Sequence, residues 1–257
     1  MNIEDHIPAT LLQPFIRTYK IIDCQDEQVN RVLPDTACAL AFRYKGQVNY
    51  LTDTNIHHLP STVITGLRTS VRLINYLQNT ATIIVQFKEG GAAAFFREPL
   101  HELFGESVSL DNFISQQKIL LIEEQLAEAT NSKQRIAIIE HFLLSILHAR
   151  RNDQLITNAI EKITTTKGII KIKELAAAVY LSQDAFEKRF RKIIGTSPKQ
   201  FSSIIRMKSI TSQIHPTQPL TDIALQAGYF DQPHFNKDFR RFTGLSPTDF
   251  FNSPSRW

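Results

Sequence analysis

The stretch from Phe186 to Phe201 reads FEKRFRKIIGTSPKQF, and the stretch from Phe235 to Phe250 reads FNKDFRRFTGLSPTDF. Residues of the first copy that recur 49 positions later include Phe186, Phe190, Arg191, Gly195, Ser197, Pro198 and Phe201. Upstream, Leu175-Ala176 matches Ile223-Ala224 at an offset of 48, so the second copy has one extra residue in its turn. An internal repeat of this kind indicates two copies of one structural unit.

Each copy predicts a helix–turn–helix unit, which is a short helix, a tight turn and a second helix of about three turns. Ser182 and Asp231 precede the second helices, where a side-chain oxygen can accept from a free backbone amide. Phenylalanines lie on one face of each second helix and basic residues on the other, so one face is expected to pack. The predicted helices are 172–179 and 183–194 in the first copy, and 220–226 and 232–243 in the second.

A charged helix face is most often simply solvated, but two helix–turn–helix units with such faces favour double-stranded DNA as the partner. An α-helix fits the major groove, where long polar side chains reach base edges and phosphates. Asp184 and Glu187 are acids that accept from the cytosine amino group but repel phosphate, so the first copy is expected to read fewer guanines. The candidates for base contacts are Gln183, Asp184, Glu187, Lys188, Arg191, Gln232, Asn236, Lys237 and Arg240, and those for phosphate contacts are Lys192, Lys199, Arg206 and Arg241.

A long helix is predicted between the two copies. Ser197 and Gln200 form a capping box with Pro198 at the first helical position, and the helix is expected to reach about Ile214. About sixteen residues at ~1.5 Å each make a rod of roughly 25 Å. Such a rod would hold the two reading helices about one DNA turn apart, ~34 Å, with bending of the DNA where the rod is shorter than that pitch.

The chain up to residue 115 has a β-rich pattern. Short runs of β-branched, aromatic and apolar residues at 37–44, 63–67 and 82–87 lie between turn signals. The segments 92–96 and 99–104 have the pattern of short helical insertions. These features predict a domain built mainly of strands.

From Gln116 to Arg150 the apolar period changes to 3.6, which predicts a helical hairpin broken at 130–132. The hairpin would link two domains and offer a surface for a homodimer. The sequence therefore predicts an α+β protein with a β-rich, cupin-like, ligand-sensing domain at 1–115, a helical hairpin linker at 116–152, and an all-α domain with two helix–turn–helix units at 153–257.

The charge of the chain is divided between its halves. Of 257 residues, 42% are hydrophobic and 21% charged, which excludes a disordered or collagen-like chain. Residues 153–257 hold 15 Lys and Arg against 9 Asp and Glu (15 − 9 = +6), whereas the remainder holds 14 against 16 (14 − 16 = −2). A polyanionic partner is therefore expected at the C-terminal part.

The sequence predicts a cytoplasmic, nucleoid-associated protein without membrane contact. The first residues lack the basic and apolar regions of a signal peptide, and the apolar segment 136–149 is shorter than the ~20 residues that span a bilayer. Cys24 and Cys38 have the spacing of neither a zinc site nor a redox motif, which is consistent with a reducing compartment.

The C-terminal segment resembles the AraC-type DNA-binding domain, in which one long helix joins two helix–turn–helix units. The resemblance implies a bacterial transcription regulator that binds duplex DNA and acts together with RNA polymerase. Two departures concern the reading helices: Pro233 stands where the family commonly has Ser, and Lys188-Arg189 stands where it often has Arg before the apolar residue. The resemblance is carried by Leu175-Ala176, Ser182, Phe186, Phe190, Gly195, Ser197-Pro198, Arg206, Asp222-Ile223-Ala224, Gly228-Tyr229, Asp231-Gln232, His234-Phe235, Phe239-Arg240, Gly244, Ser246-Pro247 and Phe250.

The N-terminal part is more weakly similar to the cupin-like sensor domains attached to such DNA-binding domains. This similarity implies a small-molecule effector, whose identity and binding residues the sequence leaves open, together with the operator and the choice between activation and repression. It is carried by Leu33-Pro34-Asp35, the strand 39–44, the segment 84–87, Gly90-Gly91 and Phe95-Phe96.

No catalytic motif emerges from the sequence, so no enzymatic activity, metal or cofactor is predicted. His101-Glu102 begins a zincin-like pattern, but Gly105 stands where the second His would be. The pair His57-His58 is interpreted as a loop feature. Two alternatives for the N-terminal domain stay open, a DNA-tethered enzyme and a protein-interaction module. Five aromatic residues are predicted to belong to the core rather than to a ligand pocket: Phe42, Tyr44, Phe87, Phe95 and Phe96.

Overall fold

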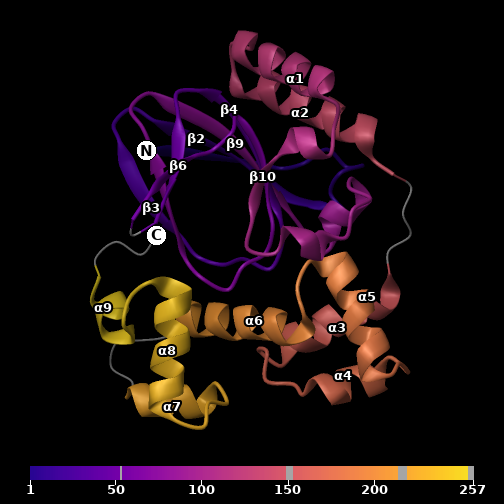
Figure 1. Cartoon of the computed structure of the whole chain (residues 1–257), viewed down its shortest axis with the longest axis vertical. Coiled ribbons are helices and arrows are strands. Elements are labelled where there is room, and N and C mark those ends of the chain that lie inside the picture. The colour runs from indigo at the N-terminus through magenta and orange to yellow at the C-terminus, as the bar shows by residue number, and fades with distance from the viewer. Residues whose placement is uncertain (53, 149–152, 214–218, 254–257) are drawn as a thin grey trace.

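The computed structural model describes residues 1–52, 54–148, 153–213 and 219–253. Figure 1 shows a β domain in the upper half of the molecule and a set of helices in the lower half, joined by the chain after α2 (Ser132–Ile146). The predicted α+β class is confirmed. None of the helices within the described ranges is long and apolar enough to cross a membrane.

The β domain is made of two antiparallel sheets. In the first, six strands lie in the order β1-β2-β9-β4-β7-β10, and in the second, four strands lie in the order β3-β8-β5-β6. The predicted runs at 37–44, 63–67 and 82–87 correspond to β4, β7 and β9. The strands are β1 (Asn2–His6), β2 (Ile16–Cys24), β3 (Gln28–Val32), β4 (Ala39–Lys45), β5 (Val48–Leu51), β6 (Ile56–His58), β7 (Thr62–Thr65), β8 (Arg72–Tyr76), β9 (Thr80–Phe87) and β10 (Ser107–Ser109).

One expectation for this domain was wrong. His57 and His58 lie on strand β6 and not in a loop, because the short segment pairs with β5, with His58 opposite Asn49. The side chains are exposed; His58 Nδ1 lies 2.8 Å from Asn49 Oδ1, and the His57 ring stacks on Tyr50. Within the described residues, no group of three His, Cys, Asp or Glu side chains is placed to hold a metal ion.

Strand β4 shows how the first sheet has two distinct faces, because successive side chains of a strand alternate. Leu40 and Phe42 are fully buried, and the Phe42 ring lies 5.9 Å from that of Phe142 on α2. Ala39 and Ala41 point to the opposite face, where a cavity lies between the two sheets. The first sheet therefore has a packed outer face and an inner face that lines a cavity.

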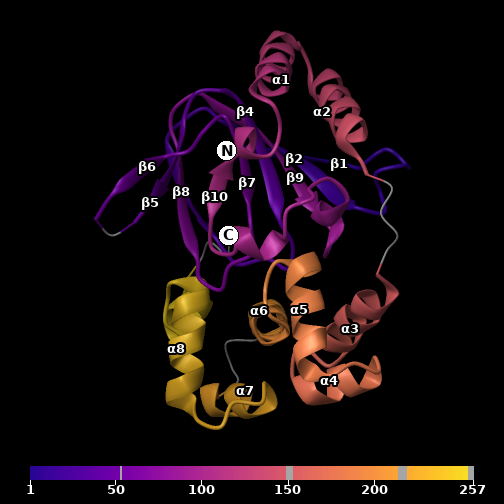
Figure 2. The same cartoon turned by 45° about the vertical axis from the view of Figure 1, so that its right-hand side comes forward.

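The predicted hairpin forms α1 (Gln116–Glu128) and α2, which pack on the face of the sheet that carries Phe42. Figure 2 shows both helices on the side of the β domain away from the C-terminal helices. The predicted helical insertions form short 3-10 helices, η1 (Gly91–Ala94) and η2 (Leu100–Leu103), and a third follows at η3 (Leu110–Asn112). Of the five aromatics, Phe42, Phe87, Phe95 and Phe96 are buried and Tyr44 packs partly buried against the same core, as predicted.

The C-terminal helices follow the predicted pattern. The bounds of α5 and α8 coincide with the predicted second helices, and α6 ends at Gln213, next to residues 214–218, which lie outside the described part and contain Ile214. The helices are α3 (Gln154–Thr165), α4 (Ile172–Ala178), α5 (Gln183–Ile194), α6 (Pro198–Gln213), α7 (Leu220–Gln226), α8 (Gln232–Thr243) and α9 (Pro247–Asn252).

The repeat is visible in the packing of the two helix–turn–helix units. The ring of Phe190 meets that of Phe201 at 5.5 Å, and the ring of Phe239 meets that of Phe250 at 5.3 Å, so each pair of the sequence repeat makes the same edge-on contact. Such aromatic pairs add stability beyond the apolar area that they bury. The duplicated sequence therefore builds two equivalent small cores, one at each end of α6.

Candidate functional site

The second helix of the first unit, α5, begins after a serine that caps its N-terminal end. The Ser182 hydroxyl accepts from the backbone amide of Ala185, which satisfies one of the free amides of the first turn. Gly195 ends the helix in the left-handed conformation, which favours glycine because a Cβ is strained there. Phe186 and Phe190 are fully buried, and the opposite face is exposed. The sequence thus fixes both the ends and the orientation of α5.

The exposed face of α5 is partly neutralised by its own acids. Lys188 Nζ lies 3.4 Å from Asp184 Oδ2, and Arg191 Nη2 lies 3.9 Å from Glu187 Oε2. Gln183 donates to Glu187 Oε1 at 3.0 Å. All five predicted base-contact residues of the first copy therefore lie together on one helix face. Because they contact one another, DNA has to replace these contacts in order to bind them.

The second helix of the second unit, α8, presents a more strongly basic face. Asp231 caps it by accepting from the amide of His234 at 2.7 Å. Lys237 and Arg240 are exposed and form no ion pair within the described part of the chain. Asn236 and Gln232 are half-buried beside them. The two copies thus differ: α8 offers free cationic side chains where α5 offers internal ion pairs.

The two helices are held in the same orientation. The C-terminal cap of α5, Gly195, lies against Leu100 of the β domain, and that of α8, Gly244, lies against Arg31 and Val71. Figure 1 shows α5 and α8 at opposite ends of α6, each with its N-terminal end directed away from the β domain. The N-terminal ends are the parts of recognition helices that reach base edges in helix–turn–helix proteins.

The turns that precede α5 and α8 expose an aromatic side chain each. Tyr180 is 95% exposed and has a φ of 57°, a left-handed conformation that Gly228 adopts in the second copy with a φ of 76°. The extra residue of the second turn is Phe230, which is 94% exposed. Sequence reasoning did not single out either aromatic, although Tyr180 stands where the second copy has glycine.

The four predicted phosphate contacts fall into different environments. Lys199 is exposed at the start of α6, and Arg241 is exposed with its Nη2 3.5 Å from Asp238 Oδ1. Lys192 is exposed but lines a cleft of about 480 Å³ between the two domains.

Arg206 differs from the other three, because its side chain turns inward. Its Nη2 donates to the carbonyl of Gly168 at 2.8 Å, and its guanidinium lies 5.3 Å from the centre of the Tyr229 ring. The side chain thus joins the turn after α3 to the second helix–turn–helix unit. From sequence alone, a basic residue on the linking helix is predicted to contact phosphate. The packing of Arg206 gives it a structural role.

Known families match both halves of the chain. Residues 175–253 match the family described as a helix-turn-helix domain, and residues 4–109 match a family described as a domain of unknown function (DUF6597). The two predicted helix–turn–helix units thus lie in a segment that matches a helix-turn-helix family. The chain thus combines a helix–turn–helix domain in its C-terminal part with a β-rich N-terminal domain.

Several solved structures are similar to the chain. ToxT from Vibrio cholerae is 8% identical, with a TM-score of 0.48 and 98% of each chain covered. A structure of unsaturated fatty acid-bound ToxT from Vibrio cholerae strain SCE256 is 10% identical, with a TM-score of 0.43, covering 91% of this chain and 94% of that one. An AraC-type regulator from Chromobacterium violaceum is 19% identical, with a TM-score of 0.35, covering 40% of this chain and 96% of that one. No curated protein matches the chain in sequence.

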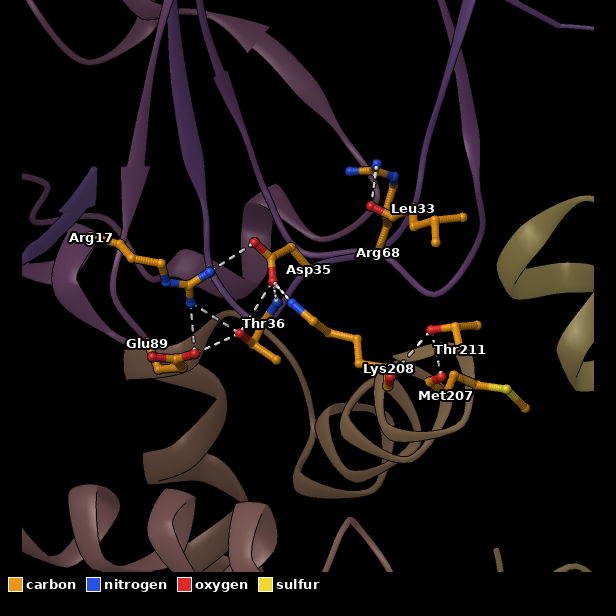
Figure 3. A network of polar contacts seen from close by, with 9 residues as sticks. All are labelled: Arg17, Leu33, Asp35, Thr36, Arg68, Glu89, Met207, Lys208 and Thr211. Atoms are coloured by element: carbon orange, nitrogen blue, oxygen red, sulfur yellow. Dashed lines mark hydrogen bonds and ion pairs between the residues drawn. The ribbon is translucent and has the colours of Figure 1, made fainter. Parts of the chain in front are cut away.

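The helix–turn–helix domain is tied to the β domain by a network of charged side chains (Figure 3). Lys208 of α6 donates from Nζ to Asp35 Oδ1, and Arg17 Nη1 donates to Asp35 Oδ2 at 3.1 Å. Arg17 also reaches Glu89 at 2.8 Å. Burial raises the pKa of the Asp35 carboxyl, but the charge and hydrogen bond of Lys208 and the charge of Arg17 outweigh it, so this pKa lies below its ordinary value.

A cavity of about 250 Å³ lies in the β domain next to this network. Its walls come from the inner faces of both sheets and are mainly apolar, and Asp35, which pairs with Lys208 of the helix–turn–helix domain, is among the lining residues. Four basic residues also line it, Lys20, Arg43, Arg68 and Arg72, and of these Arg68 and Arg72 are buried. Sequence reasoning named no ligand residue, because the alternation that turns Ala39, Ala41 and Ile74 inward is visible only once the strands are paired.

Proposed function

We propose that the protein is a sequence-specific transcription regulator whose helices α5 and α8 enter successive major grooves of duplex DNA. The observation that carries the proposal is the pair of capped, equally oriented helices at the two ends of α6, with their N-terminal ends directed away from the β domain. Because a helix of sixteen residues at ~1.5 Å each separates them, their spacing approaches one DNA turn.

The base contacts are proposed to come from both helices, with the larger share from α8. Lys237 and Arg240 are free of ion pairs within the described residues, and Gln232 and Asn236 flank them. On α5, Gln183, Lys188 and Arg191 read bases once DNA has drawn them from Asp184 and Glu187, and these acids accept from cytosine amino groups. Lys199, Lys192 and Arg241 are proposed to contact phosphates, which position the protein without specifying sequence.

The experiment that tests the assignment is a binding titration of Lys237→Ala and Arg240→Ala on a DNA site selected from the genome. Each substitution is expected to weaken binding by about 1–3 kcal/mol and to relax the sequence preference, because a side chain that touches bases is lost. Lys173→Ala, a lysine near the start of α4, is the control and is expected to bind as wild type. Unchanged affinity and preference in both α8 variants would contradict the assignment.

The β domain is proposed to sense a small molecule that controls operator occupancy through its contact with the AraC-type domain. The supporting observation is the cavity of about 250 Å³, which shares Asp35 with the interdomain ion pair to Lys208. An effector in this cavity lies next to the contact that holds the two domains. Titration of candidate molecules against the full chain, with DNA affinity as the readout, tests this control.

We also propose the division into domains at 1–115, 116–152 and 153–257, and a homodimer through the hairpin. Leu120 and Leu121 on α1 are 57% and 54% exposed, which is unusual for adjacent leucines on a helix and supports a partner surface. RNA polymerase is a further proposed partner. Sedimentation of the wild type and of Leu120→Glu/Leu121→Glu tests the dimer, since the charged variant is expected to sediment as a monomer.

A further inference from the structure

Two buried arginines line the cavity between the sheets. Arg68 precedes β8 and Arg72 begins it, and their side chains are only 8% and 9% exposed. Both line the cavity, which is otherwise walled mainly by apolar side chains. Charged side chains are almost never buried unless they are paired. The partners of these two cations therefore indicate which charge a ligand of the cavity carries.

The partners of both arginines are neutral. Arg68 donates to the carbonyls of Ser70, Val32 and Leu33 at 3.1, 2.8 and 3.1 Å. Arg72 donates to the hydroxyl of Ser107 and the carbonyl of Gly105, and lies over the Tyr50 ring. Within the described ranges neither guanidinium has a carboxylate at ion-pair distance.

An acid that also lines the cavity is already committed. Asp35 is bound by Lys208 and Arg17, so its negative charge is shared with two other cations. Burial and the like charge of Arg72 lower the pKa of the Arg68 guanidinium to about 10, so Arg68 is still charged at neutral pH. Two repelling buried cations without their own anion are costly, and an anion between them would relieve the cost.

The other walls of the cavity indicate the size and the polarity of the rest of the ligand. Strand β8 runs from Arg72 through Ile74 to Tyr76, and Val63, Ala41 and Ile84 face it from the first sheet. These side chains form an apolar wall, while Lys20, Arg43, Thr82 and Gln86 contribute to other parts of the lining. A volume of about 250 Å³ lies near the lower end of the range for ligand pockets, roughly 300–1,000 Å³. The ligand that fits is small and has an apolar body.

We propose that this cavity binds a small amphipathic anion, a monocarboxylate with a hydrocarbon or aromatic body, whose carboxylate lies between Arg68 and Arg72. Nη1 of Arg68 makes no hydrogen bond within the described residues, and it is the donor that reaches the carboxylate. The planar guanidinium of an arginine matches a carboxylate with two parallel hydrogen bonds. The assignment rests on the proposed sensing function and specifies the chemical class of its effector.

The test is calorimetric titration of the full chain, without DNA, with octanoate, 1-octanol, octylammonium and acetate. Octanoate is expected to bind saturably, and the neutral and cationic molecules of equal length, as well as the anion without an apolar body, at least tenfold more weakly. Arg68→Gln is expected to reduce octanoate affinity at least tenfold, because the donor that reaches the carboxylate is lost. The thermal midpoint of the unliganded variant is measured beside it, since the substitution also removes hydrogen bonds to three backbone carbonyls. Arg97→Gln, an exposed arginine outside the cavity, is the control and is expected to bind as wild type.

A second variant protects the test against misfolding of the first. Ile74→Phe fills the cavity and keeps both arginines, and it is expected to abolish octanoate binding with little effect on the unliganded midpoint. Octanol binding as tight as octanoate, or unchanged octanoate affinity in Arg68→Gln, would overturn the anion assignment and leave the sensing function standing. Octanoate binding that leaves DNA affinity unaltered would instead support the anion site and contradict the sensing function.

Discussion

Asp35 of the β domain and Lys208 of α6 form an ion pair across the domain boundary (Figure 3). The two residues are separated by 173 positions in the chain, so the pair exists only when both domains are folded and in contact. Asp35 also lines the sensor cavity and holds Arg17. One carboxylate therefore belongs both to the cavity and to the contact with the DNA-binding domain.

Asp35→Asn is expected to weaken the domain contact. Loss of the carboxylate leaves Lys208 and Arg17 without their partner, and we expect about 1 kcal/mol less stability at neutral pH because Lys208 is partly exposed. Asp5→Asn, which breaks the exposed pair with Lys20, is the matched control and is expected to have no measurable effect. Chemical denaturation of the full chain measures both variants, and equal stability of Asp35→Asn and wild type would contradict the role of the pair.

The same pair predicts a pH dependence. The pKa of Asp35 is lower in the folded chain than its ordinary value of about 3.9, so its stabilising contribution is complete above that value and is lost as the pH falls toward the folded pKa. The difference in stability between wild type and Asp35→Asn is therefore expected to be constant from pH 7 to pH 5 and to shrink below about pH 4. A difference that grows on acidification would have the wrong sign for this account.

Tyr180→Gly is expected to stabilise the chain. Tyr180 holds a φ of 57° and is 95% exposed, so glycine removes backbone strain without removing buried surface. The gain is expected to be up to about 1 kcal/mol, less than the strain itself because glycine also has more freedom in the unfolded chain. The mirror substitution Gly228→Ala should destabilise, because the nearest atom to its new Cβ is 3.4 Å away and the cost comes from the backbone. Unfolding curves that order the two variants the other way would refute the strain argument.

Arg206 and Lys199 are expected to differ in what they do for DNA binding. Lys199→Gln should reduce the slope of log affinity against log salt by about 1, because one phosphate contact is lost. Arg206→Gln should leave that slope unchanged and lower stability, because its bond to the Gly168 carbonyl and its contact with Tyr229 are lost. A reduced salt slope in Arg206→Gln would instead show that Arg206 contacts a phosphate.

The helix–turn–helix units could be predicted from sequence because their determinants are local. Ser182, Asp231 and the capping box of Ser197 and Gln200 set helix ends through contacts within four residues, and the repeat places the apolar faces. The packing of Arg206 could not be predicted for the opposite reason: its partner, Gly168, lies 38 positions away.

The β domain was predictable only in outline. Apolar runs predicted β4, β7 and β9, but the register that turns Arg72 and Ala39 toward one cavity depends on strands far apart in sequence. The short strand that carries His57 and His58 has no apolar alternation of its own and is formed by pairing with β5. Pairing between strands that are distant in sequence therefore sets the register of the sheets, and local sequence patterns do not reveal that register.

The most direct test of the central claim is the pattern of guanine methylation protection on a bound operator, since methylation probes the major groove. Two protected segments about one helical turn apart on one face of the duplex are expected. In Lys237→Ala/Arg240→Ala the segment under α8 should lose protection while the other keeps it. A single protected segment, or two that the double substitution leaves unchanged, would contradict the placement of α5 and α8 in successive major grooves.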